Sequence, residues 1–234
     1  MPDHGFPWRQ TTLLDDLKNY ESSVYSQSGE DGVLQRLFDV IGVHNRFFVE
    51  FGAGDGLFLS NTAHLRLDHD WTGLLMEGGD RADGEVVRRE FVSAENINPL
   101  FERYEVPPVF DLLSIDIDGN DYWVWQAIDG FVPRVVVVEY NVFFGLHQAC
   151  TVPYEADRIW DSSMYHGASL AAFQKLGHEK GYTLVHAESW APNAFFVLNS
   201  ELPADFQSRP LHEITPWNSF VTSPPVSGRT WVHV

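Results

Sequence analysis

Carboxylates gather at the ends of two apolar segments of this sequence. Asp116 and Asp118 follow the first segment, in SIDIDGND at 114–121, and Glu139 and Asn141 follow the second, VVVVEYN. Strand alternation would place the two aspartates on one face, where they repel each other unless a cation or a proton intervenes. Oxygen atoms from Asp118, Glu139 and Asn141 would together suit Mg²⁺ or a similar divalent ion. The sequence therefore predicts a metal site that these three residues form.

A glycine-rich turn, FVEFGAGDG at 48–56, ends an earlier apolar run. Its glycines are Gly52, Gly54 and Gly56. A dinucleotide needs free backbone N–H groups facing its pyrophosphate, so the acids Glu50 and Asp55 would be unfavourable there. Leu57 also stands where the dinucleotide pattern requires a third glycine. S-adenosylmethionine (SAM) carries a sulfonium and an ammonium but no phosphate, so the acids favour SAM, although a lone match of this kind also fits an ordinary glycine-rich turn.

Two further polar residues stand where later strands are expected to end. Glu77, which closes the next strand, is placed to accept hydrogen bonds from the ribose hydroxyls of a bound adenosine. Asn96 lies where the adenine edge would be, although asparagine is common in turns for local reasons alone. An interpretation without metal also stays open: Asp116 would hold the methionine end of SAM, and Asp118 or Asp121 would cap the following helix.

Histidines supply candidates for a general base. His147 follows the strand that ends in Glu139, and His166 precedes the last expected helix. A histidine in either place could remove a proton from a nucleophilic hydroxyl. Each could equally be a surface histidine. The candidate catalytic residues are Asp118, His147 and His166.

Strand and helix patterns alternate along the chain and must position these side chains. Buried strands are expected at 46–51, 71–77, 91–93, 110–117, 134–140, 182–187 and 194–198, with helices at 33–41, 59–68, 81–90, 122–128 and 167–177. The last two strands are too close for a crossover helix and must pair antiparallel. We therefore predict a doubly wound α/β fold, Rossmann-like, with a mostly parallel seven-stranded sheet and an antiparallel C-terminal hairpin.

Composition limits the class of protein. At 234 residues and 44% hydrophobic content, one domain at 25–202 is expected, with a peripheral segment at 1–24 and a tail at 203–234. The net charge of −18 argues against nucleic acid and membrane-surface partners. The single cysteine, Cys150, and the absence of a secretory signal pattern favour a cytoplasmic protein. The composition does not decide between a monomer and a homo-oligomer.

An ordered set of motifs resembles the FkbM-like branch of the class I SAM-dependent methyltransferases. The set is YSQSGEDG, VEFGAGDG, SNTAHL, WTGLLMEGGD, SAENIN, SIDIDGNDYWVW, VVVVEYN, GASLAAF and NAFFVL, and it spans roughly 25–198. The resemblance implies that Gln27 and Gly29 help to close over the cofactor. With it, the residues expected to bind SAM are Gln27, Gly29, Glu50, Gly52, Gly54, Gly56, Asn61, Glu77, Gly78, Asn96 and Asp116.

The resemblance also implies O-methylation of a hydroxyl on a sugar or a specialised metabolite. Two departures from the motifs of known methyltransferases concern this implied activity. Much of the family has Asp-x-Glu-Gly where this chain has Asp116-Ile-Asp118-Gly119, and catechol-type O-methyltransferases place an Asp-Asn pair around Mg²⁺ where this chain has Glu139-Tyr-Asn141. The sequence therefore predicts a SAM-dependent O-methyltransferase acting on a hydroxylated small molecule, with metal assistance open. Carboxylate or amine methylation, a non-catalytic SAM-binding module and, less favoured because of Leu57, an NAD-dependent oxidoreductase are the alternatives.

Overall fold

A seven-stranded sheet forms the centre of the protein. The computed structural model describes residues 14, 16–189, 192–215 and 228–234, so parts of the predicted terminal segments lie outside the described residues. The strands of the sheet are β1 (Phe47–Phe51), β2 (Thr72–Glu77), β3 (Val87–Arg89), β4 (Val109–Ile115), β5 (Val132–Glu139), β7 (Tyr182–Ala187) and β8 (Asn193–Leu198). Their spatial order is β3-β2-β1-β4-β5-β8-β7. All neighbours pair parallel except β8, which is antiparallel to both β5 and β7. The predicted fold class is confirmed.

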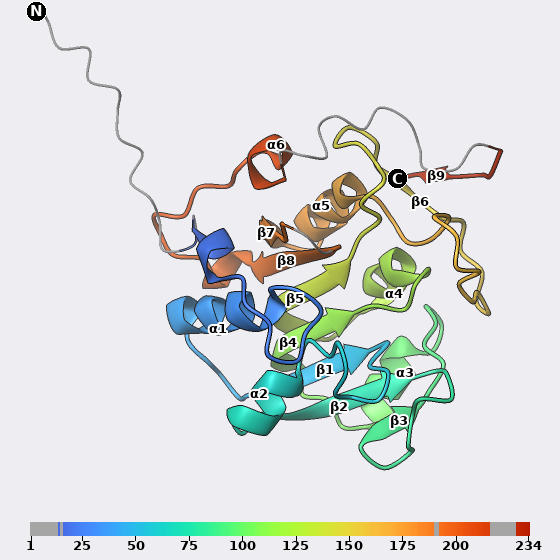
Figure 1. Ribbon diagram of the computed structural model, residues 1–234, viewed down its shortest axis with the longest axis horizontal. Helices are drawn as coiled ribbons and strands as arrows, with labels where there is room; N and C mark the ends of the chain where they lie inside the picture. The colour runs from blue at the N-terminus through green and yellow to red at the C-terminus, as the bar shows by residue number, and fades with distance from the viewer. Residues whose placement is uncertain (1–13, 15, 190–191, 216–227) are drawn as a thin grey trace, which may run out of the picture.

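Helices cover both faces of the sheet (Figure 1). One face carries α1 (Glu30–Ile41) and α2 (Ala63–Asp68), and their apolar side chains pack with strand residues such as Phe48 in one buried cluster. The other face carries α3 (Ile97–Arg103), α4 (Asp121–Ala127) and α5 (Leu170–Glu179), which form a second cluster. Because side chains of the central strands are buried on both faces, β4 and β5 are almost continuously apolar, as expected for parallel strands between two helical layers.

The segment at 81–90 differs from its predicted structure. Asp83 Oδ1 accepts hydrogen bonds from the backbone N–H groups of 85–87, at 2.9 Å each, and Gly84 has a φ of +82°. These contacts make a tight turn, and the chain then enters β3. The predictions of a helix at 81–90 and of a strand at 91–93 are therefore wrong.

Two other helices differ from the sequence expectation. The helix predicted at 59–68 begins at Ala63, because 60–62 are hydrogen-bonded to Glu50 instead. The short helix α3 was not predicted, and it begins at Ile97 directly after Asn96.

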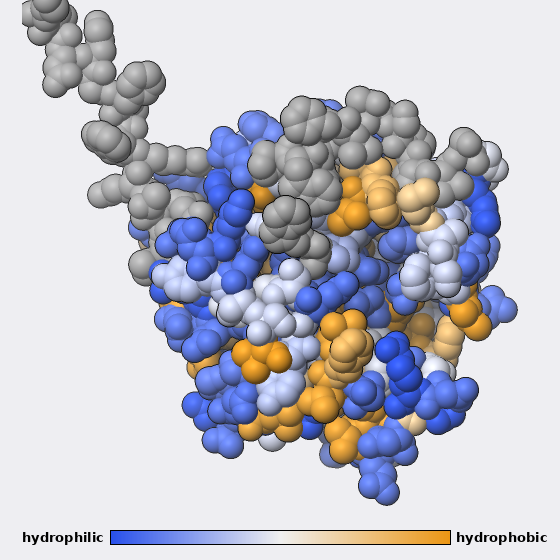
Figure 2. All heavy atoms as spheres, viewed as in Figure 1, coloured by the Kyte–Doolittle hydropathy of each residue, from blue (hydrophilic) through white to orange (hydrophobic). Residues whose placement is uncertain are grey.

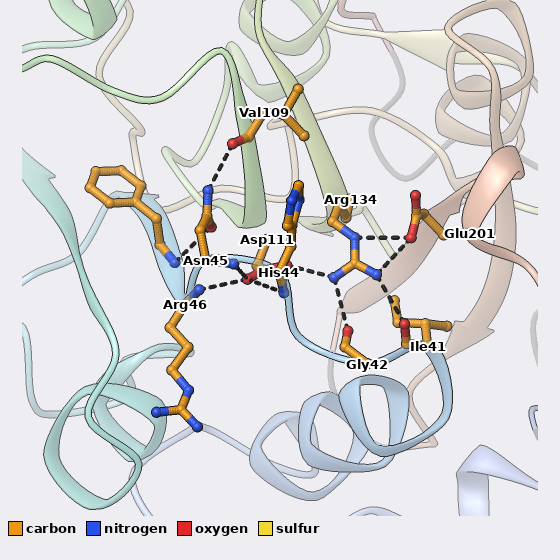
Figure 3. Close-up of polar contacts among 10 residues, drawn as sticks. Ile41, Gly42, His44, Asn45, Arg46, Val109, Asp111, Arg134 and Glu201 are labelled. Atoms are coloured by element: carbon orange, nitrogen blue, oxygen red, sulfur yellow. Dashed lines mark hydrogen bonds and ion pairs between the residues drawn. The ribbon is translucent and has the colours of Figure 1, made fainter.

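A buried ion pair joins the amino ends of β4 and β5 (Figure 3). Asp111 and Arg134 are in contact at 2.6 Å, with 0% and 7% of their side chains exposed. Arg134 also binds Glu201 at 2.6 Å and donates to the carbonyl groups of Ile41 and Gly42. The Asp111 carboxylate accepts hydrogen bonds from the backbone N–H groups of 44–46. This network fastens the α1–β1 connection and the segment after β8 to the centre of the sheet.

The peripheral elements are short. They are the 3₁₀ helices η1 (Leu17–Tyr20) and η2 (Asn199–Glu201), the helix α6 (Leu211–Ile214), and the strand pair β6 (Cys150–Thr151) with β9 (Val232–His233). Beside β9, the Trp231 ring contacts the Phe144 and Tyr165 rings, with centroid distances of 4.6 and 4.7 Å. The C-terminal residues 228–234 thus support the long loop between β5 and α5.

The face shown in Figure 2 is mostly hydrophilic and carries several smaller hydrophobic patches, in keeping with the high acidic content. Within the described part of the chain, every helix is too short or too polar to cross a membrane.

Candidate functional site

Two cavities open at the carboxyl edge of the sheet. The smaller cavity, of about 450 Å³, is lined by residues that follow β1, β2 and β4. The larger cavity, of about 820 Å³, is lined by residues at the ends of β5 and β7 and by residues of η1 and α6. Asp118 and Trp160 line both. The two spaces therefore meet beside Asp118, and segments outside the predicted 25–202 domain contribute to the larger one.

The three glycines of the turn after β1 have different roles. A Cβ atom on Gly52 would lie 1.4 Å from the Asp116 carbonyl oxygen, and the φ of Gly52 is +77°, so only glycine allows this approach to β4. Gly54 lines the smaller cavity and donates its N–H to Glu77 Oε2 at 3.0 Å. Gly56 lines neither cavity, and a Cβ there would lie 2.9 Å from Val87 Cγ2. Gly56 therefore serves packing.

Glu50 does not face either cavity. Its carboxylate accepts hydrogen bonds from Ser60 Oγ, Thr62 Oγ1 and the Asn61 backbone N–H, and only 4% of the residue is exposed. Burial raises the pKa of Glu50. The residue fastens the turn to β1, which corrects the prediction that it contacts the cofactor. Asn61 does line the smaller cavity, where its amide donates to Ser114 Oγ at 3.1 Å.

The carboxyl end of β2 lines the smaller cavity. Glu77 accepts the N–H groups of Gly54 and Gly79, at 3.0 and 2.7 Å, and Gly78 lies beside it on the wall. A carboxylate held in this way keeps free lone pairs for further donors. Asn96, in contrast, lines neither cavity: its side chain accepts from the Ser93 N–H and donates to the Phe91 carbonyl, both at 2.8 Å. Its role is the local turn, so the prediction of an adenine contact is corrected.

The segment before α1 closes one side of the smaller cavity. Gln27, which is predicted to help close over the cofactor, lines this cavity. Gly29 does not: its N–H donates to Glu188 Oε1 at 2.7 Å, and a Cβ on it would lie 2.6 Å from Glu21 Cβ. Gly29 therefore lets the segment pack against the β7–β8 hairpin, and Gln27 alone of the two can reach a ligand.

The buried Glu188 side chain, which accepts the Gly29 N–H, should make the stability of the protein depend on pH. Burial, and after it the neighbouring Glu30 carboxylate, raises the pKa of Glu188 from 4.5 to about 9. Between these two pH values the folded protein keeps a proton that the unfolded chain releases, so stability falls as pH rises, by up to about 1.4 kcal/mol per pH unit. We expect Glu188→Gln to remove this slope. The stability of the variant relative to wild type should therefore rise from pH 5 to pH 9.

Urea unfolding at several pH values measures this difference. Glu179→Gln, at an exposed position of α5, is the matched control and should show no such trend. A difference between Glu188→Gln and wild type that stays constant with pH would contradict the assignment.

Asp118, Glu139 and His166 converge where the cavities meet. One ligand atom from each lies within 4.8 Å of the other two, and the distance between His166 Nδ1 and Glu139 Oε2 is 3.9 Å. His166 Nδ1 is buried and has no hydrogen-bond partner among the described residues. Asp118 takes a φ of +56°, unusual for a residue other than glycine. Two carboxylates and an imidazole in this arrangement form a candidate site for a divalent cation.

The carboxylates of this region share a strongly acidic environment. Burial, followed by nearby carboxylates, raises the pKa of Asp116 and of Glu139. Burial also raises the pKa of Asp118 and lowers the pKa of His166. Carboxylates this close to one another disfavour full ionisation, which a bound cation or a shared proton would relieve.

Two predicted site residues lie elsewhere. The Asn141 amide donates to the carbonyl groups of Met164 and His166, each at 2.9 Å, and its oxygen accepts the Phe143 N–H. Asn141 was predicted as a ligand of this site, and the prediction is corrected: its side chain shapes the loop, and the third residue of the cluster is His166. His147 is exposed and lines neither cavity. The spacing of residues in the sequence could propose His166 as a base, but not its approach to Asp118 and Glu139.

Comparisons with known proteins reach only distant similarities. No family model matches the chain, and no curated protein matches its sequence. Among solved structures, the chain is similar to an S-adenosylmethionine-dependent methyltransferase from Clostridium acetobutylicum, with 9% identity and a TM-score of 0.37 over 72% of this chain and 90% of that chain. It is also similar to an O-methyltransferase family protein from Burkholderia thailandensis, with 13% identity and a TM-score of 0.35 over 72% and 57%. The CMeT domain of citrinin polyketide synthase has 11% identity and a TM-score of 0.34 over 75% and 54%. Similarities this distant do not show a family.

Proposed function

We propose that the protein is a SAM-dependent methyltransferase that methylates a hydroxyl group of a small molecule. The observation that carries the proposal is the meeting of the two cavities at Asp118 and Trp160. Methyl transfer requires donor and acceptor to be aligned in contact, with water largely excluded. In this proposal the smaller cavity holds SAM and the larger one holds the acceptor. The FkbM-like resemblance in the sequence agrees with this arrangement.

The smaller cavity suits SAM better than a dinucleotide. Its lining residues include four acids, Glu77, Glu90, Asp116 and Asp118, against two arginines, Arg81 and Arg158. Carboxylates attract a sulfonium and an ammonium and repel a pyrophosphate. Bound SAM would supply a methyl group already activated by its sulfonium. The protein's own contribution is to orient the cofactor through Glu77 and Asp116 and to direct its methyl group toward the larger cavity.

The larger cavity suits an acceptor with an apolar body and a hydroxyl. Val142, Phe143 and Trp160 provide apolar surface, and the cluster of Asp118, Glu139 and His166 lies on the same wall. In the proposed reaction His166 Nδ1, which has no hydrogen-bond partner among the described residues, receives the hydroxyl proton or binds a cation. A divalent ion on these three residues would lower the pKa of the acceptor hydroxyl. The mixed oxygen and nitrogen donors fit such an ion.

Titration calorimetry tests the first half of this proposal. We expect wild-type protein to bind SAM and its product S-adenosylhomocysteine (SAH) and not to bind NAD. Binding of NAD without binding of SAM would overturn the proposal in favour of an oxidoreductase. Binding of SAM without turnover of any acceptor would favour the non-catalytic module.

A panel of acceptors tests the second half. Hydroxylated sugars and phenols should accept the methyl group, whereas matched carboxylates and amines should not. Each assay is run before and after EDTA treatment and dialysis. Loss of activity on chelation, with recovery on addition of Mg²⁺, supports the cation, and full activity after chelation removes the cation from the mechanism.

A further inference from the structure

The reversed direction of β8 brings an additional residue to the carboxyl edge of the sheet. Because β8 is antiparallel to β5, its first residue, Asn193, pairs with Glu139, the last residue of β5. Functional groups in parallel sheets lie at the carboxyl ends of strands. For this one strand the equivalent position is the amino end. Asn193 therefore lies at the level of the candidate site even though it begins a strand.

The Asn193 amide has a fixed orientation. Only 2% of the residue is exposed, and Nδ2 donates to Glu30 Oε1 at 2.7 Å. Glu30 is itself held by the Ser28 N–H at 2.8 Å. Because a carboxylate oxygen accepts hydrogen bonds, the amide nitrogen must face Glu30, and the oxygen of Asn193 must face the other way.

Asn193 Oδ1 is a buried acceptor without a partner among the described residues. The residue lines the smaller cavity. Buried acceptors in folded proteins are almost always satisfied, and leaving one unsatisfied is costly. A donor on a molecule that binds in this cavity would satisfy it.

The neighbouring wall indicates which donor fits. Gln27, Gly52 and Asp116 line the same cavity and bring a carboxamide, a backbone turn and a carboxylate, but no cation. The two arginines of the cavity lie at Gly54 and Gly119: Arg81 is near Gly54, and Arg158 is against Gly119. An oxygen acceptor in a cavity that Asp116 also lines favours an ammonium group over a carboxylate as the bound group.

We propose that Asn193 Oδ1 accepts a hydrogen bond from the α-ammonium group at the methionine end of the cofactor. Asn193 is thus a binding residue for SAM, held in place by Glu30 of helix α1. This inference rests on the proposed function, since it takes SAM as the ligand of the smaller cavity.

Calorimetry with three ligands tests the inference. The ligands are SAH, an SAH analogue with hydrogen in place of the α-ammonium group, and 5′-methylthioadenosine, which lacks the amino-acid end. Asn193→Ala should weaken SAH binding by about 10- to 100-fold, the usual size of a hydrogen bond to a charged group. Its affinity for the other two ligands should equal that of wild type. Asn199→Ala, which changes the asparagine just beyond the opposite end of β8, should bind all three as wild type does.

Each outcome separates the inference from the proposed function. If wild type binds none of the three ligands, the proposed function fails. If wild type binds SAH and Asn193→Ala binds it equally well, only this inference fails. Equal losses for SAH and 5′-methylthioadenosine would also overturn it, because Asn193 would then act on the shape of the whole cavity. Should Asn193→Ala not fold, Asn193→Ser gives the same comparison with a smaller change in polarity.

Discussion

His166→Ala is expected to lower kcat for methyl transfer by about 10²- to 10⁴-fold, the range for loss of a positioned general base. His166 lines the larger cavity, and its Nδ1 lies 3.9 Å from Glu139 Oε2 without a hydrogen-bond partner among the described residues. The residue lies outside the smaller cavity, so the affinity for SAM should stay unchanged. Steady-state kinetics measures kcat, and calorimetry measures SAM binding.

His147→Ala is the matched comparison, because the sequence proposes both histidines and the structure leaves His147 exposed and outside both cavities. It should keep the wild-type kcat. Equal losses in the two variants would contradict the site. The role of His166 follows from two further readouts: weaker Mn²⁺ binding indicates a metal ligand, and recovery of activity on addition of imidazole indicates a base.

Asp111→Ala is expected to destabilise the fold by about 3–5 kcal/mol, because the variant leaves the buried Arg134 guanidinium without its fully buried charge partner. The three backbone N–H groups of 44–46 lose their acceptor in the same variant. For a domain of this size the loss corresponds to a fall in Tm of about 6–20 °C. Thermal unfolding by circular dichroism measures it.

Asp80→Ala is the control for this prediction. Asp80 pairs with Arg89 at 3.1 Å on the surface, where ion pairs contribute little. Its Tm should match wild type. A similar Tm for Asp111→Ala and Asp80→Ala would show that the buried network does not hold the α1–β1 connection in place.

Most of the sheet was predictable because its strands are short apolar runs between strong turn signals. β7 and β8 match their predicted ranges to within one residue, and the short link between them requires antiparallel pairing. The segment at 81–90 was predicted wrongly because one side-chain contact decided its structure. Asp83 binds three backbone N–H groups in a turn, and this local bond outweighed the helical spacing of the residues around it.

The candidate site was predictable where strand ends determine it, as for Glu77, Asp116, Asp118 and Glu139. The role of a polar residue was not predictable where its side chain could bind either a ligand or a nearby group of the protein. Glu50 and Asn96 are residues of a suitable type near the site, yet both side chains make local hydrogen bonds within the protein instead. Sequence spacing does not reveal such competition.

Asn193 shows a second limit of the sequence. Asn193 is not among the predicted site residues, since it begins a strand and site residues are expected where parallel strands end. The antiparallel pairing was predicted correctly, and that pairing implies that the amino end of β8 meets the carboxyl ends of its neighbours. A search for site residues in such sheets should therefore include the first residue of any reversed strand.

The ion network of Asp111, Arg134 and Glu201 also bears on how such a protein could evolve. The network joins the amino ends of β4 and β5, whereas the candidate site occupies the opposite edge of the same strands. Substitutions around the larger cavity can therefore accumulate without touching this ion network. In a lineage with this arrangement, mutations at the carboxyl edge of the sheet could change the molecule that the larger cavity binds. Selection would meanwhile keep the amino edge constant.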